Sequence, residues 1–352
     1  MSGSVAVEEN AVGQSGGIKR PHRPGRRFRV ALVVVAVLTI AAGFIVRSPS
    51  PVGHWDSAQG QDRFMAAYDE AFAEMPEAEE SVDVRTDFGI VRLYRFSGTG
   101  DATGTGTATA PLILLPGRSA ASPVWADNLP MLREIGDVYT IDLLGEPGMS
   151  VQERPIQNDE DQAAWLHQAL ESLPEDRFHL IGLSIGGWSA VNLAVHESEL
   201  VATMSLIDPV FVFGEMPLST VMRSIPAAFS WLPKSWRDDF NSYTAGGAPV
   251  EDVPVAEMIE AGMQHYNLKL PQPARISEEQ LAAIDLPVLA ILAGDSVMHD
   301  PQAAVGTAER ALSDGTVSYY PGASHALSGE QPEQIAIDIA GFISENSSSG
   351  GK

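Results

Sequence analysis

Short apolar runs alternate along the chain with stretches in which apolar residues recur at helical spacing. Eight apolar runs predict strands, and the first two alternate polar and apolar residues like a hairpin. From the third run onward, strands and helical stretches follow one another, which is typical of a mostly parallel sheet covered by helices on both faces. The predicted strands are residues 82–85, 90–96, 112–115, 138–142, 178–183, 203–207, 288–293 and 316–320, and the predicted helices are residues 62–75, 125–135, 161–173, 185–196, 302–312 and 332–343.

Residues 211–285 interrupt this rhythm with prolines, tryptophans and short helical pieces. Their place between two predicted strands favours a helical lid inserted into an α/β domain of residues 62–346. Residues 97–110, rich in Gly and Thr, predict a flexible insertion. The polar tail from Ser344 onward is not expected to fold, and residues 347–352 are interpreted as disordered.

The N-terminal region contains 17 uncharged residues, Val30 to Val46, which follow six Lys and Arg residues and end at Arg47. A helix of this length reaches about 26 Å, the short end of what spans a bilayer. The charge bias favours a transmembrane signal anchor at 30–46, with the N-terminus in the cytoplasm and the catalytic domain outside it. Residues 1–29 are interpreted as a disordered cytoplasmic segment. Residues 47–61 are interpreted as a linker. A cleaved signal peptide, which would give a secreted protein, and a buried helix are the alternatives.

Charge and cysteine content exclude several classes of function. The 352 residues have a net charge of −24, and beyond residue 50 the chain has 15 basic and 44 acidic residues, a net of −29. A domain with this negative charge would be repelled by nucleic acid. The absence of cysteine excludes disulfides, thiolate metal sites and a cysteine nucleophile.

The strongest chemical motif is Gly-x-Ser-x-Gly at residues 182–186, between a predicted strand and a predicted helix. This context is typical of a nucleophile elbow, a tight turn that exposes a serine Oγ to a base and to the substrate. Gly182 and Gly186 are expected where a Cβ would clash with neighbouring backbone. The sequence therefore predicts Ser184 as the nucleophile.

A general base is expected downstream of the serine, and His325 follows the last predicted strand. It would take the Ser184 proton and return it to the leaving group. His196, His265 and His299 are interpreted as surface or packing residues.

Three aspartates compete for the acid that orients His325. Asp295, at the end of residues 288–293, is preferred, and Asp208, one strand earlier, is the first alternative. Asp300 precedes a proline and is more typical of a helix cap. Asp142 is interpreted as structural, holding the loop of residues 143–150.

The oxyanion needs two backbone N–H donors. We expect one from Ile185, directly after the nucleophile, and one from Arg118, in the loop after residues 112–115.

Together the Leu-Pro-Gly-Arg loop at 115–118, the loop at 142–150, the Ser184 elbow, Gly294-Asp295 and the segment 321–325 make residues 82–345 resemble the α/β-hydrolase superfamily, specifically its cap-bearing, esterase-like branch. The resemblance implies an α/β-hydrolase fold with an eight-stranded sheet, a small ester substrate and no cofactor or metal. Two positions depart from the family pattern. Pro116 stands where the family usually has His, and Val297 stands where it usually places the acid.

The leading functional hypothesis is a serine hydrolase that cleaves carboxylic esters, lipidic ones included, through an acyl-enzyme on Ser184. Perhydrolase or haloperoxidase-like chemistry, C–C bond hydrolysis and acyl transfer would use the same triad. A pseudo-hydrolase that only binds a ligand is the non-enzymatic alternative.

Overall fold

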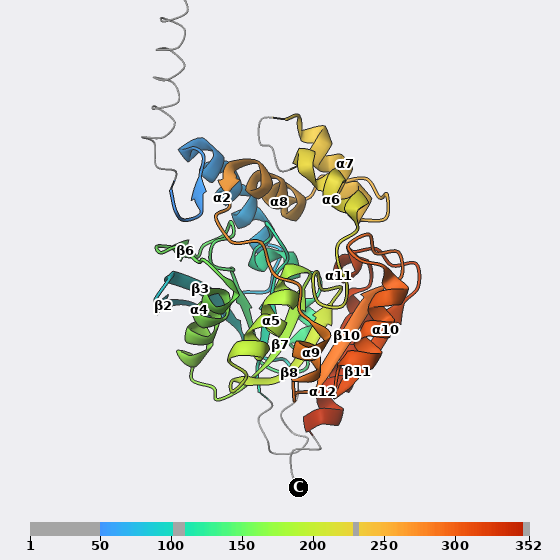
Figure 1. Ribbon diagram of the computed structural model, residues 1–352. Helices are drawn as coiled ribbons and strands as arrows, with labels where there is room; N and C mark the ends of the chain where they lie inside the picture. Colours follow the sequence, from blue (N-terminus) through green and yellow to red (C-terminus); the bar gives the residue numbers. More distant parts are fainter. Residues whose placement is uncertain (1–49, 101–109, 228–231, 348–352) are drawn as a thin grey trace, which may run out of the picture. The chain divides into compact units, whose positions relative to one another are not determined.

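The computed structural model describes residues 50–100, 110–227 and 232–347 (Figure 1). Within these residues, one sheet has eight strands in the order β11-β10-β8-β7-β4-β5-β3-β2, and the two-residue β6 pairs with β3 as a ninth. All eight predicted strands are present, and the two-residue strands β1, β6 and β9 are additions. The strands are β1 His54–Trp55, β2 Glu80–Thr86, β3 Gly89–Phe96, β4 Leu112–Leu115, β5 Val138–Ile141, β6 Val151–Gln152, β7 Phe178–Leu183, β8 Val201–Ile207, β9 Tyr266–Asn267, β10 Val288–Ala293 and β11 Gly315–Tyr320.

The sheet is mostly parallel, as predicted. The neighbours from β11 to β5 pair in parallel, whereas β3 is antiparallel to β2, β5 and β6. Every residue of β4, β5, β7 and β10 is buried. Uninterrupted apolar runs form strands here because helices cover both faces of the parallel sheet.

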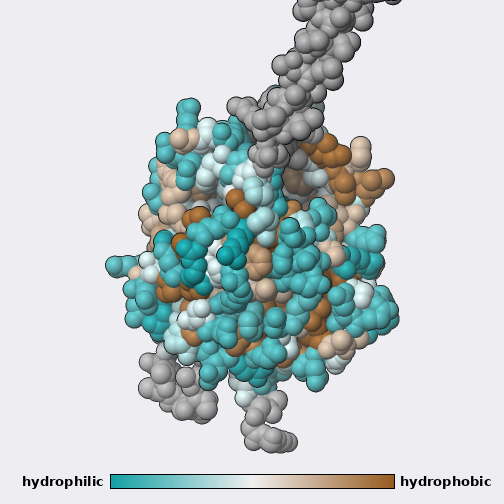
Figure 2. Space-filling view, turned by 60° about the vertical axis from the view of Figure 1, so that its left-hand side comes forward, coloured by the Kyte–Doolittle hydropathy of each residue, from teal (hydrophilic) through white to brown (hydrophobic). Residues whose placement is uncertain are grey.

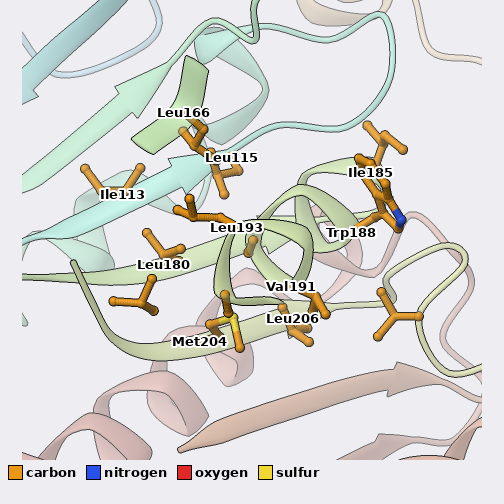
Figure 3. Close-up of a cluster of buried hydrophobic side chains, with 14 of the residues drawn as sticks. Ile113, Leu115, Leu166, Leu180, Ile185, Trp188, Val191, Leu193, Met204 and Leu206 are labelled. Carbon is orange, nitrogen blue, oxygen red and sulfur yellow. The ribbon is translucent and has the colours of Figure 1, made fainter. Parts of the chain in front are cut away.

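Two hydrophobic cores lie on opposite faces of the sheet. Alternate residues of β4 divide between them, since Ile113 and Leu115 belong to one core and Leu112 and Leu114 to the other. The first core includes residues of α4, α5, α9 and α10, and Figure 3 shows side chains of α5 meeting those of the strands beneath it. The second includes residues of α2, α3, α8 and α12.

The helices agree with the predicted positions to within a few residues, except that the stretch 125–135 is divided between η1 and α3. They are α2 Ala58–Phe72, η1 Ser122–Trp125, α3 Leu129–Leu132, α4 Asp159–Glu171, α5 Ile185–His196, α6 Leu218–Ala227, α7 Lys234–Thr244, α8 Pro254–His265, α9 Glu278–Ala282, α10 Pro301–Ala311, α11 Leu327–Glu330 and α12 Pro332–Ser347. We call α6, α7 and α8, which lie between β8 and β10 in the chain, the cap helices.

The N-terminal helix α2 begins earlier than predicted, inside the expected linker of residues 47–61. Ser57 caps it by accepting a hydrogen bond from the Gly60 N–H, and β1 lies just before it. This part of the linker prediction is wrong because the serine side chain supplies a helix start and β1 pairs with β9. Further along α2, the Tyr68 hydroxyl donates a hydrogen bond to Asp142.

The C-terminal helix corrects a second expectation. α12 runs to Ser347, although the chain was expected to stop folding at Ser344. Ile339, Phe342 and Ile343 are buried and hold the last turns against the sheet. The predicted span at 30–46 and most of the predicted flexible insertion lie outside the described residues. Among the described residues, no helix combines the length and apolar character needed to cross a membrane.

Candidate active site

The nucleophile elbow joins β7 to α5 at Ser184. The serine has a φ of 54°, a left-handed conformation that a non-glycine residue adopts only under local constraint. A Cβ at Gly186 would overlap the Leu115 carbonyl oxygen, and one at Gly182 would lie 2.5 Å from the Gly186 carbonyl oxygen. Both glycines are therefore required by close backbone approach, as the motif predicts.

His325 lies beside this serine. It sits on the loop after β11, and its Nε2 is 3.0 Å from Ser184 Oγ. Its Nδ1 is 2.6 Å from Asp208 Oδ2. Because Nδ1 donates to a carboxylate, Nε2 is left to accept the hydroxyl proton of Ser184. The predicted nucleophile and base are therefore brought into the geometry of a serine–histidine pair.

The carboxylate that meets His325 is Asp208, at the end of β8. Its side chain is fully buried and also accepts from the Ala293 N–H at 3.1 Å and from Ser296 Oγ at 2.6 Å. Burial alone would raise the pKa of Asp208, but the contacts with His299 and His325 outweigh it and hold this pKa well below its usual range. Asp208 is thus kept ionised against the imidazole.

The prediction that preferred Asp295 as the acid is wrong, because His325 Nδ1 meets Asp208 instead. Asp295 is exposed, and its backbone N–H donates to the Ala323 carbonyl at 2.9 Å, so that the residue holds the histidine loop by its main chain. Asp300 caps α10 by accepting from the Ala303 N–H at 2.9 Å. β8 lies directly beside β7 in the sheet, whereas β10 is one strand further away, so the end of β8 is nearer the elbow.

His299, interpreted from the sequence as a surface or packing residue, lies against the acid. Its side chain is only 1% exposed, and its Nε2 is 3.2 Å from Asp208 Oδ1, although the alignment falls short of a hydrogen bond. Asp208 therefore lies between two imidazoles. His196 and His265 are partly exposed and lie by Glu160 and Asp56, as surface histidines do.

The loop after β4 runs alongside the nucleophile. A Cβ at Gly117 would be 3.8 Å from Ser184 Cβ, which brings the backbone of this loop to the serine. The roles of Arg118 and Ile185 as oxyanion donors stay predictions.

Glu146 holds the same loop, and no sequence signal pointed to it. This carboxylate is buried, accepts from the Ser119 N–H at 3.1 Å and lies 3.2 Å from Arg118 Nη1. Ser119 has a φ of 56°. A buried carboxylate thus holds this loop at the two residues that follow Gly117.

Asp142 is structural, as predicted. Its oxygens accept from the Ser122 N–H and Oγ, the Met149 N–H and the Tyr68 hydroxyl. Burial raises the pKa of Asp142 although these donors oppose the shift. The residue therefore joins the loop of residues 143–150 to η1 and α2.

Residues 112–339 match the family model described as the alpha/beta hydrolase family. The match covers well over half of the chain, so this protein belongs to the α/β-hydrolase family and is a hydrolase by fold and family.

Two relatives are named carboxylesterases. The Bacillus subtilis (strain 168) protein named uncharacterized carboxylesterase nap is 25% identical over 292 residues, which cover 80% of this chain and 92% of that protein. The crystal structure of carboxylesterase CesB (YbfK) from Bacillus subtilis has a TM-score of 0.73 at 23% identity and covers 81% of this chain and 99% of its own. The crystal structure of a bacterial membrane phospholipase A has a TM-score of 0.60 at 19% identity and covers 91% of this chain and 99% of its own.

Proposed function

We propose that this protein is a serine esterase that hydrolyses carboxylic esters through an acyl-enzyme on Ser184. The observation that carries the proposal is the chain of hydrogen-bond distances from Ser184 Oγ to His325 Nε2 and from His325 Nδ1 to Asp208, 3.0 and 2.6 Å. The carboxylesterase names of the relatives support the ester as substrate.

The proposed reaction begins when His325 Nε2 takes the Ser184 proton as Oγ attacks the ester carbonyl carbon. Asp208 stabilises the imidazolium that forms. The N–H groups of Ile185 and Arg118 would stabilise the oxyanion. His325 then gives its proton to the departing alcohol, and water releases the acid from Ser184 by the same steps in reverse order.

A binding-only protein would not need this arrangement. The left-handed serine costs folding free energy, and the ionised acid and the oriented imidazole serve to activate its one hydroxyl. Perhydrolysis, C–C hydrolysis and acyl transfer would start from the same activated serine, and no observation favours one of them over ester hydrolysis.

The test is fluorophosphonate labelling together with turnover of p-nitrophenyl esters of increasing acyl length. We expect the wild type to react and Ser184→Ala and His325→Ala to lose both signals. A folded wild type that neither labels nor turns over any ester would refute the proposal.

For location, we propose that residues 30–46 form an uncleaved signal anchor with the catalytic domain outside the cytoplasm. The supporting observation is the apolar run preceded by six basic residues. The intact mass of the chain from its native membrane, combined with protease accessibility from the outer side, tests this. A chain that begins beyond residue 46 would favour cleavage and secretion.

A further inference from the structure

The cap helix α6 presents its large apolar side chains to solvent. Leu218, Val221, Met222 and Ile225 are 75%, 38%, 59% and 44% exposed. Their spacing of three and four residues places all four on one stripe of the helix. The face turned inward has small or polar residues, Thr220 and Ala227, which are buried. This is the reverse of the usual helix on a soluble surface, whose apolar stripe faces the core.

Two aromatic residues of the next helix, α7, lie beside this apolar stripe. Arg223 is the one charged residue of α6, and its guanidinium stacks on the Tyr243 ring of α7 with its carbon 4.4 Å from the ring centroid. Trp236, on α7, is 46% exposed. We call Leu218, Val221, Met222, Ile225 and Trp236 the cap patch. Figure 2 shows hydrophobic atoms gathered at the end of the molecule where Figure 1 places α6 and α7.

The cap helices contact the segments next to the catalytic residues. On the inner side of α6, the Thr220 hydroxyl donates to the Val297 carbonyl, next to Ser296, which donates to Asp208. After α7, a Cβ at Gly246 would lie 3.2 Å from Ser324 Cβ, next to His325. The helices that carry the cap patch therefore contact the segments that hold Asp208 and His325.

The first 49 residues indicate what covers this patch. The apolar segment 30–46 is separated from the first described residue, Ser50, by only three residues, which span about 10 Å when extended. An anchor at 30–46 would therefore keep the domain at the bilayer surface. Figure 1 places the start of the described chain, with β1 and α2, at the same end of the molecule as the cap helices. The net charge of −29 beyond residue 50 disfavours electrostatic attraction to anionic lipid and therefore favours an apolar contact.

We propose that the cap patch inserts into the surface of the phospholipid bilayer in which the chain is anchored, and that the esters hydrolysed are acyl lipids drawn from it. This inference rests on the proposed esterase activity and signal anchor. α6 then has the form of an interfacial helix, apolar toward the acyl chains and small or polar toward the protein.

The first experiment measures insertion directly, in the full chain reconstituted into phosphatidylcholine vesicles. Because the chain has no cysteine, Met222→Cys gives a single site for an environment-sensitive fluorophore. Ile337→Cys, 63% exposed on α12, is the matched control. We expect nitroxide groups on the lipid acyl chains to quench the label at 222 and not at 337, and to do so equally when anionic lipid is added.

Each other outcome has a distinct meaning. A chain that floats with the vesicles but stays unquenched at 222 overturns the bilayer contact and leaves the anchor intact. A spectral shift at 222 that depends on protein concentration and not on lipid overturns it in favour of a second copy of the chain. A chain that does not float refutes the anchor, and with it this inference.

The second experiment separates the lipid contact from the chemistry. We compare the triple variant Leu218→Ser, Met222→Ser, Ile225→Ser with Val151→Ser, a residue 53% exposed on β6. We expect the triple variant to lose at least ~10-fold in hydrolysis of a phospholipid ester in vesicles, with unchanged turnover of a soluble short-chain ester. Equal rates on both substrates for variant and wild type, or a parallel loss on both, overturn the inference. A wild type inactive on the soluble ester refutes the esterase instead.

Discussion

Asp208 and Asp142 occupy similar places in the sheet and have opposite electrostatic surroundings. Each follows a parallel strand, β8 or β5, and each is fully buried. Asp208 meets two imidazoles and its pKa is lowered, whereas Asp142 meets hydroxyls and backbone N–H groups and its pKa is raised. The comparison shows that hydrogen bonds from neutral donors hold a buried carboxylate in place, whereas partners able to take a positive charge keep it ionised for catalysis.

The largest expected effect is the loss of activity on replacing Asp208. In Asp208→Asn, the amide cannot both accept from His325 Nδ1–H and match the imidazolium charge, so we expect the rate constant kcat to fall on the order of 10³–10⁴-fold. The measurement is steady-state ester turnover, with the circular dichroism spectrum to show that the variant is folded.

Asp295→Asn is the matched control for this variant. Asp295 is exposed and contributes its main chain, so we expect near wild-type turnover. A loss in Asp295→Asn as large as that in Asp208→Asn would show that the acid is assigned to the wrong strand.

The elbow and the histidine were predictable because local patterns specify them. Gly182 and Gly186 frame a turn whose backbone contacts exclude a Cβ, and His325 follows the last strand in chain order. The family prediction is confirmed by the family model.

The acid was not predictable in the same way. Asp208 and Asp295 both follow a strand, and which one meets His325 depends on strand order and on the side chain's direction at a φ of 42°. Neither the strand order nor the side-chain direction can be inferred from the spacing of residues in the sequence. The contacts of Ser296, His299 and Glu146 were missed for the same reason, since their partners lie 27 or more residues away.

The second largest expected effect is a loss of stability on replacing Asp142, the structural one of the two buried aspartates. In Asp142→Asn one of the two oxygens becomes an NH₂ group, which faces either the Ser122 donors or the Met149 N–H. We expect the free energy of unfolding to fall by about 2–3 kcal/mol. Urea unfolding followed by tryptophan fluorescence measures this, and activity per folded molecule should fall far less than in Asp208→Asn. Wild-type stability with lost activity would reverse the roles that we assign to the two carboxylates.

A smaller effect is expected at His299. In His299→Asn, Asp208 loses one of its two imidazole neighbours and keeps His325, Ser296 and the Ala293 N–H as partners. We expect kcat to fall about 10-fold, or about 1.4 kcal/mol, with little change in KM, because the His299 side chain is only 1% exposed. His196→Asn, at a partly exposed histidine, is the control. An unchanged kcat would mean that His325 alone sets the state of Asp208.

The smallest expected effect is on how stability depends on pH, and here the two carboxylates should differ in sign. The folded pKa of Asp208 is lowered, so its stabilising contribution is present above the unfolded value of about 3.9 and is lost as pH falls through the folded pKa. The folded pKa of Asp142 is raised, so stability falls as pH rises from about 3.9 through that pKa. Urea unfolding across this range should show a smaller rise with pH in Asp208→Asn and a smaller fall in Asp142→Asn. Each change in slope should be below about 1.4 kcal/mol per pH unit, the limit for one proton. Slopes that change in the same direction in both variants would contradict the difference between the two sites.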